Sequence, residues 1–170
     1  MFQSDREFLG VITQQITNFF DKNHWTYDKK EISPTTTIFE LSFMIEGHTI
    51  KMSAQIDVKR RACILVGYLP IYADPVYSYP LCQLIAKENA KKLFGAIKYD
   101  ERDGEVTYDY AYSVANGIDE EEFEKLFHIV LKMVLDECEI LEHYCNGRLN
   151  KQETNEVIDK IQKLVNDIMR

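Results

Sequence analysis

The order of the periodic segments constrains the fold of this chain more than any other feature of its sequence. An amphipathic helical pattern comes first, and three or four segments with strand periodicity follow it. A second helical pattern, two more strand segments and a long helical pattern complete the order. Successive strands joined by short turns favour an antiparallel sheet, whose apolar face the helices must cover. The order therefore predicts an α+β domain with an antiparallel sheet and helices packed mainly on one face (α-β-β-β-α-β-β-α), plus an extra C-terminal helix.

The first helical pattern covers about residues 5–22. Ser4 and Glu7 form the S-x-x-E pattern of a capping box at its start. Its apolar residues recur at three- and four-residue steps, so they share one helix face. These residues are Phe8, Leu9, Ile12, Ile16, Phe19 and Phe20.

The next segments have the period of strands. An extended segment runs from about residue 25 to 34. Segments 35–46 and 48–58 then alternate apolar and polar residues, and Gly47 lies in the turn between them, which predicts a hairpin. Segment 62–69 is apolar on both faces. One face of an antiparallel sheet normally meets water, so the second face of this strand needs a cover from a helix, a loop or another subunit.

The second half of the chain supplies the remaining helices and strands. Residues 70–80 hold three prolines and three tyrosines, which is typical of an ordered loop. A helix is expected at about 81–94, followed by strands over 96–100 and 105–114. A long apolar stripe then predicts a helix that ends near residue 144, where Asn146-Gly147 follows.

The last segment, about 151–169, is a strongly amphipathic helical pattern. Its apolar residues are Val157, Ile158, Ile161, Leu164, Val165 and Ile168. Such a stripe must pack on the body of the protein, a twin subunit or a ligand. We therefore divide the chain into a domain over 1–146 and a C-terminal helix over 147–170, packed on the domain or at a dimer interface.

Composition limits the class of protein. The chain has 170 residues, 45% of them hydrophobic, which suits one domain with its own core. Its net charge is −8, and an acidic surface repels phosphate backbones, which argues against nucleic acid as a partner. No apolar run approaches the roughly 20 residues of a transmembrane helix, and residues 1–7 lack a signal-peptide pattern. We expect a cytoplasmic protein with no membrane partner.

The cysteines and their neighbours do not form a metal-binding pattern. The four cysteines lie far apart, which favours reduced, packed thiols over disulfides. The densest set of possible ligands comprises Cys138, Glu142, His143 and Cys145. The two cysteines share a helix face with apolar residues, whereas His143 falls on another side, and neither C-x-x-C nor H-E-x-x-H occurs. We interpret this set as structural and expect no metal and no cofactor.

No catalytic motif is present. The histidines His24, His48, His128 and His143 are not part of a recognisable nucleophile motif, and G-x-S-x-G is absent. The acidic loop over 100–105 lacks the ligand spacing of a calcium loop and is interpreted as a hairpin tip. We predict a non-enzymatic protein without catalytic residues.

Tyrosine is the most informative excess. Ten tyrosines occur, and they cluster over 68–79 and 108–112. Tyrosine buries a large amphipathic ring in cores and is enriched at interfaces, so both roles stay open. For 108–112 we favour the core. Our candidate partner-binding residues are Leu65, Tyr68, Tyr72, Tyr77 and Tyr79, and we expect alanine at Leu65 or Tyr72 to weaken association more than folding.

One stretch of the chain resembles a known family. Glu88-Asn89, then Leu93-Phe94-Gly95-Ala96-Ile97-Lys98-Tyr99-Asp100, then Asp103-Gly104-Glu105-Val106, resemble the pattern of the YbjN family, within the type III secretion chaperone-like fold. The resemblance covers about residues 1–146. It implies a non-enzymatic, dimeric module, and the secretion chaperones of this fold bind an extended client segment by strand addition and apolar grooves. No catalytic residue transfers from the family.

Together these observations predict a chaperone-like or regulatory protein-binding module, expected to be a bacterial homodimer that binds partner segments through a sheet edge and an apolar surface. The expected surfaces are strand 62–69, loop 70–80 and the exposed side of helix 81–94. The alternative is a small-ligand-binding protein or enzyme with a tyrosine-lined pocket, which would need a deep cavity with convergent polar groups and a histidine.

Overall fold

The computed structural model of the chain describes residues 4–45, 47–73 and 75–145. The strands are β1 (Tyr27–Ser33), β2 (Thr36–Ile45), β3 (His48–Asp57), β4 (Ala62–Tyr72), β5 (Ala96–Tyr99) and β6 (Glu105–Ser113). The helices are α1 (Asp5–Lys22), α2 (Ser78–Asn89) and α3 (Glu120–Cys145), with a short 3-10 turn at Pro75–Tyr77 before α2. The strands form one antiparallel sheet in the order β1-β2-β3-β4-β6-β5.

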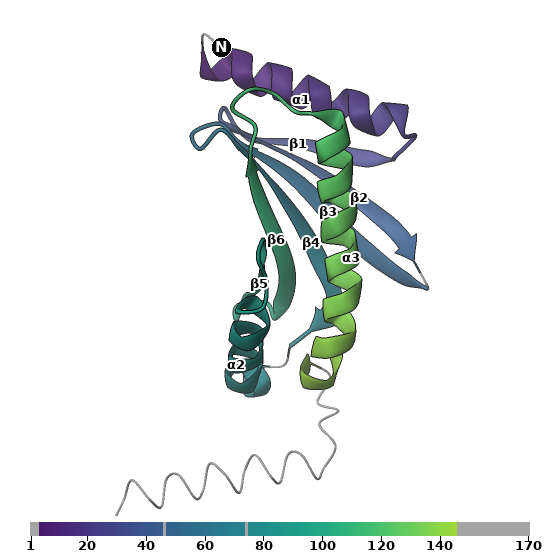
Figure 1. Ribbon diagram of the computed structural model, residues 1–170, viewed down its shortest axis with the longest axis vertical. Coiled ribbons are helices and arrows are strands. Elements are labelled where there is room, and N and C mark those ends of the chain that lie inside the picture. Colours follow the sequence, from purple (N-terminus) through teal and green to yellow (C-terminus); the bar gives the residue numbers. More distant parts are fainter. Residues whose placement is uncertain (1–3, 46, 74, 146–170) are drawn as a thin grey trace, which may run out of the picture.

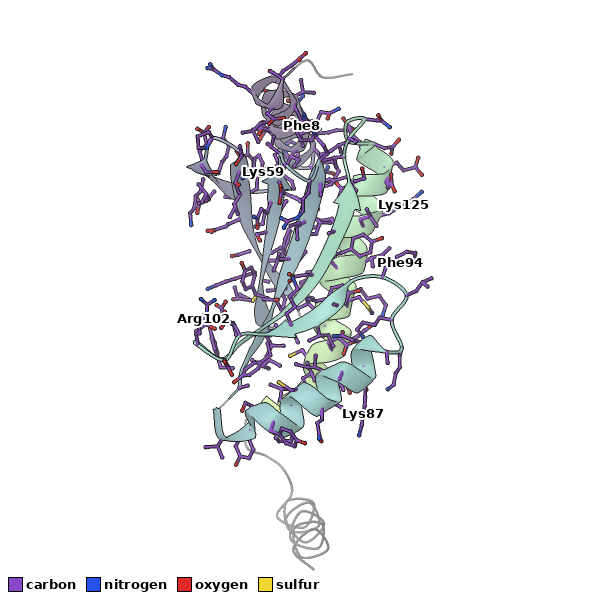
Figure 2. All side chains as sticks on the ribbon, turned by 90° about the vertical axis from the view of Figure 1, so that its left-hand side faces the viewer. Phe8, Lys59, Lys87, Phe94, Arg102 and Lys125 are labelled. Carbon is purple, nitrogen blue, oxygen red and sulfur yellow. The ribbon has the colours of Figure 1, made fainter. Side chains whose placement is uncertain are left out.

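The helices lie mainly on one side of this sheet. Figure 1 shows α3 running along one face beside β4, with α1 across the upper end of the sheet and α2 at its lower end. Figure 2 shows the molecule from the side, with α3 on one side of the sheet and no helix of the described chain covering the other. The α+β class and the one-sided helix layer predicted from the sequence are therefore confirmed.

The predicted face of α1 forms part of the core. Ser4 caps the helix, because its hydroxyl oxygen accepts a hydrogen bond from the backbone N–H of Glu7 at 3.1 Å. Phe8, Ile12, Ile16, Phe19 and Phe20 of the predicted stripe are buried. Aromatic rings then join α1 to α3 and the sheet, because Phe20 contacts the rings of Phe39 on β2 and Phe127 on α3.

A glycine lets α3 approach the sheet closely. Gly67 lies in β4, and a Cβ atom at this position would lie 2.2 Å from Cγ2 of Val134 and 3.2 Å from Cγ1 of Val130. Any larger residue would therefore push the helix away from the strand. Cys63 and Leu65 lie on the same face of β4 and are also buried in the core.

Two boundaries differ from the sequence prediction for identifiable reasons. The strand predicted over 62–69 continues to Tyr72. Pro70 has no N–H to donate, but it lies beyond the last residue of β4 that pairs with β3 and within a register shift against β6, so the sheet tolerates it there. Helix α2 begins at Ser78 instead of 81, because Pro80 falls in the first turn, where backbone N–H groups have no intrahelical partner.

The extended segment after Trp25 pairs with β2 as β1, so four strands precede α2 instead of three. The predicted helix over 151–169 lies outside the described residues.

Candidate functional site

The described residues contain no group of three or more histidine, cysteine or acidic side chains that could hold a metal ion. Cys138 is half-buried on α3, while the side chains of Glu142, His143 and Cys145 lie outside the described part. His128 has its Nδ1 atom 2.9 Å from the carbonyl oxygen of Glu124, one turn earlier in its own helix. Its ring also lies edge-on to Trp25, which is a packing contact.

The acidic loop is a closed hairpin tip. Asp100 accepts hydrogen bonds from the backbone N–H and the guanidinium of Arg102. These hydrogen bonds lower the pKa of Asp100 to about 2. Gly104, with a φ of +78°, completes the turn into β6. The carboxylate is thus paired with an arginine, which agrees with the interpretation of this loop as a hairpin tip.

The sheet face opposite α3, which we call the open face, has an apolar centre. Ile64, Val66 and Tyr68 are half-buried there and lie in a row along β4. Ile38 of β2 belongs to the same face, since it pairs with Gln55, which in turn pairs with Ile64. This is the second face of the strand 62–69 that the sequence indicated as needing a cover, and no described helix covers it.

Ion pairs flank this apolar row on both sides. Lys30 of β1 and Glu40 of β2 are joined at 2.5 Å, and Lys98 of β5 and Asp109 of β6 are also joined at 2.5 Å. All four side chains are at least partly exposed, so these pairs contribute little stability. Polar strand partners, among them Ser53 and Gln55 of β3 and Asp109 of β6, lie directly beside the row, so the open face is a narrow apolar row within a polar surface.

Tyr68 lies at the centre of three hollows on this face. One, of about 480 Å³, extends to β1 and is lined by Asp28, Ser42 and Lys51, among others. The second, of about 310 Å³, extends along Pro70 to Tyr72. The third, of about 600 Å³, extends toward Arg102 at the hairpin tip. Glu105 borders all three hollows beside Tyr68.

The five residues predicted to bind a partner occupy different environments. Leu65 is 0% exposed beneath the helix layer. Tyr68 is half-buried on the open face, and Tyr77 is half-buried just before α2. Tyr72 and Tyr79 are 61% and 68% exposed. Tyr72 and Tyr79 are therefore accessible to a partner, and Tyr68 and Tyr77 are accessible in part.

Leu65 requires a correction. Its burial means that alanine would leave a cavity in the core, which typically costs about 2–5 kcal/mol of stability. The expectation that this substitution affects association more than folding is therefore wrong. A strand that is apolar on both faces does not reveal from sequence alone which face the helices cover.

The tyrosines of β6 behave as the sequence analysis favoured. Tyr108 is buried and its hydroxyl donates a hydrogen bond to the carbonyl oxygen of Phe94 at 2.7 Å. Tyr112 lies beside its strand partner Cys63, and burial raises the pKa of the tyrosine hydroxyl. Burial also raises the pKa of the Cys63 thiol to about 12. This thiol is inert in the folded protein.

The two edges of the sheet differ. At the β5 edge, the side-chain amide of Asn89 donates to the carbonyl oxygen of Ile97 at 3.0 Å, and its oxygen accepts from the N–H of Ile97 at 2.8 Å. Both backbone groups of Ile97 are thus occupied by a helix side chain. At the β1 edge, no hydrogen bond from another described element covers the outer side of the strand. Within the described chain, a helix side chain thus caps the β5 edge at Ile97, and β1 has no comparable contact.

Sequence reasoning missed a buried ion pair between helices. Lys92, just after α2, pairs with Glu137 of α3, and both side chains are largely buried. The Oε2 atom of Glu137 has no hydrogen-bond partner within the described chain. The sequence carried one sign of this buried charge. Glu137 lies seven residues after Val130, so it falls on the apolar stripe of α3.

Comparison with known proteins shows the fold of this chain. No protein-family model and no curated protein matches its sequence. Solved structures do match: YbjN of E. coli, described as a candidate transcription regulator, superposes with a TM-score of 0.53 at 13% identity, covering 76% of this chain and 91% of YbjN. The ExsC–ExsE complex matches with a TM-score of 0.52 at 14% identity, covering 79% and 96%. The HopA1–SchA chaperone–effector complex matches with a TM-score of 0.52 at 12% identity, covering 82% and 98%.

These similarities confirm the fold expected from the sequence resemblance, since YbjN and the chaperone structures share the arrangement described above. At such low identity they establish the fold alone. The described helices also include none that is long and apolar enough to span a bilayer.

Proposed function

We propose that this protein is a non-enzymatic, chaperone-like module that binds an extended segment of a partner protein. The partner segment adds to the free edge of β1 and places side chains in the hollows around Tyr68. Two of the solved structures with this fold are complexes between two proteins, one of them a chaperone with its effector, which supports a protein partner. We also propose that the protein is a homodimer in the bacterial cytoplasm.

The difference between the two sheet edges is the observation on which the proposal depends. Strand addition requires unpaired backbone N–H and C=O groups along an edge. Asn89 occupies these groups at Ile97 of β5, whereas the seven-residue strand β1 receives no hydrogen bond at its outer side from another described element. The hollow of about 480 Å³ begins at Asp28 of β1 and reaches Tyr68, so edge and hollow are continuous.

The alternative of a ligand pocket or an enzyme receives less support. The described side chains that line the three hollows around Tyr68 include no histidine. These hollows lie at the surface of the sheet, whereas small-molecule sites usually enclose most of the ligand in an apolar cleft. An open, polar-bordered surface suits a peptide better than a reacting small molecule.

Site-specific photo-crosslinking in the native host tests the proposal. A photoreactive amino acid replaces Asp28 or Tyr68 on the binding surface, or Lys125 on the outer side of α3 as the control (Figure 2). We expect a discrete protein adduct from the first two positions and none from Lys125. A peptide from the crosslinked partner should then bind the purified protein, and Tyr68→Ala should weaken that binding at least tenfold.

Hydrogen exchange identifies the edge that is used. The bound peptide should slow exchange of the β1 amides and leave those of β5 unchanged. Protection of β5 instead of β1, or equal adducts from Lys125 and Tyr68, would overturn the proposed binding mode.

A further inference from the structure

We infer that the partner segment carries a lysine or arginine whose cationic group binds Glu105 beside Tyr68 on the open face. Glu105 is the first residue of β6, next to the hairpin tip that Figure 2 marks with Arg102. The following residue, Val106, is buried in the core, so the Glu105 side chain lies on the opposite face of the sheet. This part of the partner's chemistry rests on the proposed function.

Glu105 differs from the other carboxylates that the described fold shields from water. The others that are half-buried or buried each have a lysine or arginine partner within the chain, namely Asp57, Glu88, Asp100, Asp109, Asp136 and Glu137. The half-buried carboxylate of Glu105 has neither an ion pair nor a hydrogen bond with any described residue. A partly desolvated charge without a counterion is costly, so this position favours a cation from outside the chain.

Two tyrosines of β4 flank this carboxylate. Tyr72 is the strand partner of Glu105, and Tyr68 is the strand partner of Thr107, two residues further along β6. Tyr68 and Glu105 border all three hollows of the open face, and Tyr72 borders the hollow of about 310 Å³ with them. The face of an aromatic ring attracts a cation, and a carboxylate binds it directly. The three side chains together therefore suit an ammonium or guanidinium group.

Lys51 competes with an external cation for this position. It is the strand partner of Tyr68 from β3 and borders two of the hollows that Glu105 borders. Lys51 is exposed and forms no ion pair with any described residue, whereas Lys98 and Arg102, which line the third hollow, are already paired with acidic residues. Its positive charge lowers the affinity of the site for a second cation, so removing that charge should tighten binding.

Two small probes test the cation site without a partner protein. N-acetyl-arginine amide and N-acetyl-lysine amide each present one cationic side chain on a neutral backbone, and N-acetyl-citrulline amide is the neutral counterpart of the first. We expect the cationic probes to shift the amide NMR signals of residues 67–73 and 104–108 in a saturable manner, and the citrulline probe to leave them unshifted. The cationic probe that binds more tightly shows whether the partner residue is arginine or lysine.

Matched variants show whether Glu105 holds the probe. Glu105→Gln should weaken binding of the tighter probe about tenfold, and Lys51→Gln should tighten it about twofold. Glu139→Gln removes the same charge from an exposed position on α3 and should leave binding unchanged. The midpoint of urea unfolding should be no lower in Glu105→Gln than in the wild type, because the described chain supplies no partner for this carboxylate. Shifts that do not saturate, equal shifts by the citrulline probe, or unchanged binding in Glu105→Gln would overturn the cation site.

The partner peptide obtained by photo-crosslinking separates the cation site from the proposed function. Replacing its arginines by citrulline and its lysines by norleucine should weaken binding to the wild type about tenfold and have little effect on binding to Glu105→Gln. If the neutral peptide binds the wild type as tightly as the original, the cation site is overturned and the proposed function stands. If the cationic probes bind but no protein adduct forms at Asp28 or Tyr68, the proposed function fails, while Glu105 remains a cation-binding site.

Discussion

Gly95 is held in a conformation that suits glycine, directly beside the ring of Tyr108. Its φ is +68°, and a Cβ atom there would lie 2.4 Å from the hydroxyl oxygen of Tyr108. That hydroxyl cannot move away freely, because it donates a hydrogen bond to the carbonyl oxygen of Phe94. The Leu-Phe-Gly-Ala-Ile stretch that resembled the YbjN pattern therefore has a packing reason for its glycine.

Alanine at Gly95 should lower the free energy of unfolding by more than about 1 kcal/mol, because the positive φ disfavours a side chain and the tyrosine must shift. Gly10 is the matched control, since it lies in α1 and a Cβ atom there would have no other atom within 4 Å. Gly10→Ala should instead stabilise the protein by up to about 1 kcal/mol through helix propensity. Urea denaturation measures both changes, and equal midpoints for the two variants would contradict the packing account.

Cys63 makes stability depend on pH in the alkaline range. Burial holds its pKa at about 12 in the folded protein, against 9.0 for a solvated thiol. The folded state thus retains a proton that the unfolded state loses, so stability is complete below pH 9 and falls as pH rises from 9 toward 12. Each pH unit in this window costs about 1.4 kcal/mol per group.

The free energy of unfolding, measured under reducing conditions between pH 8 and 10.5, should therefore fall less steeply for Cys63→Ala than for the wild type. The exposed Cys82 gives the control, because Cys82→Ala should keep the wild-type slope. If the free energy of unfolding falls equally steeply with pH in Cys63→Ala and the wild type, this thiol does not contribute to the pH dependence of stability.

At the scale of elements, α2 is attached to the body through few but specific contacts. Leu81 and Ile85 are its buried apolar residues, Asn89 bonds β5, and Lys92 pairs with Glu137 of α3. Removing one member of a buried ion pair leaves an uncompensated charge, which costs about 3–5 kcal/mol. The pair therefore fixes the position of α2 against α3.

Lys92→Met should destabilise the protein by about that amount, whereas the double variant Lys92→Met with Glu137→Leu should recover most of the loss. Thermal and urea unfolding of the two single variants and the double variant give the interaction energy as a double-mutant cycle. Additive losses in the double variant would argue against direct coupling. Lys125 and Glu121, an exposed pair on α3, serve as the control and should show a coupling below about 1 kcal/mol.

At the scale of the whole molecule, the exposed apolar side chains before and within α2 are the expected dimer surface. Val76 and Tyr79 are 79% and 68% exposed. Contiguous exposed apolar side chains are typical of association sites. Because the proposed partner segment occupies the open face, we expect a second copy to use this surface.

Sedimentation equilibrium should give the mass of a dimer for the wild type, and Val76→Glu with Tyr79→Glu should shift it toward the monomer. Ile129→Glu places the same charge on the outer side of α3 and should leave the dimer intact. A monomer mass for the wild type at every concentration would refute the homodimer. If Ile129→Glu dissociates the dimer instead, the dimer interface lies on α3.

Local pattern was sufficient where a residue's role depends on its near neighbours in sequence. The capping box at Ser4, the apolar face of α1 and the hairpin at Gly47 follow from periodicity and turn chemistry, and each is present. The candidate site could be predicted only in part from such local patterns. Tyr68 and Tyr72 were identified by residue type, whereas the roles of Asn89 at Ile97 and Glu137 at Lys92 depend on helix placement.

The sequence by itself determined the class of fold, because helical and strand periods arise from backbone geometry that each segment has on its own. It also determined that β4 would be apolar on both sides. Only the tertiary structure decided which side α3 covers, and hence that Leu65 belongs to the core while Tyr68 lies on the open face. The same is true of the sheet edges, since Asn89 closes one edge only after α2 packs beside β5. Such choices depend on contacts between residues far apart in the chain, which no local pattern records.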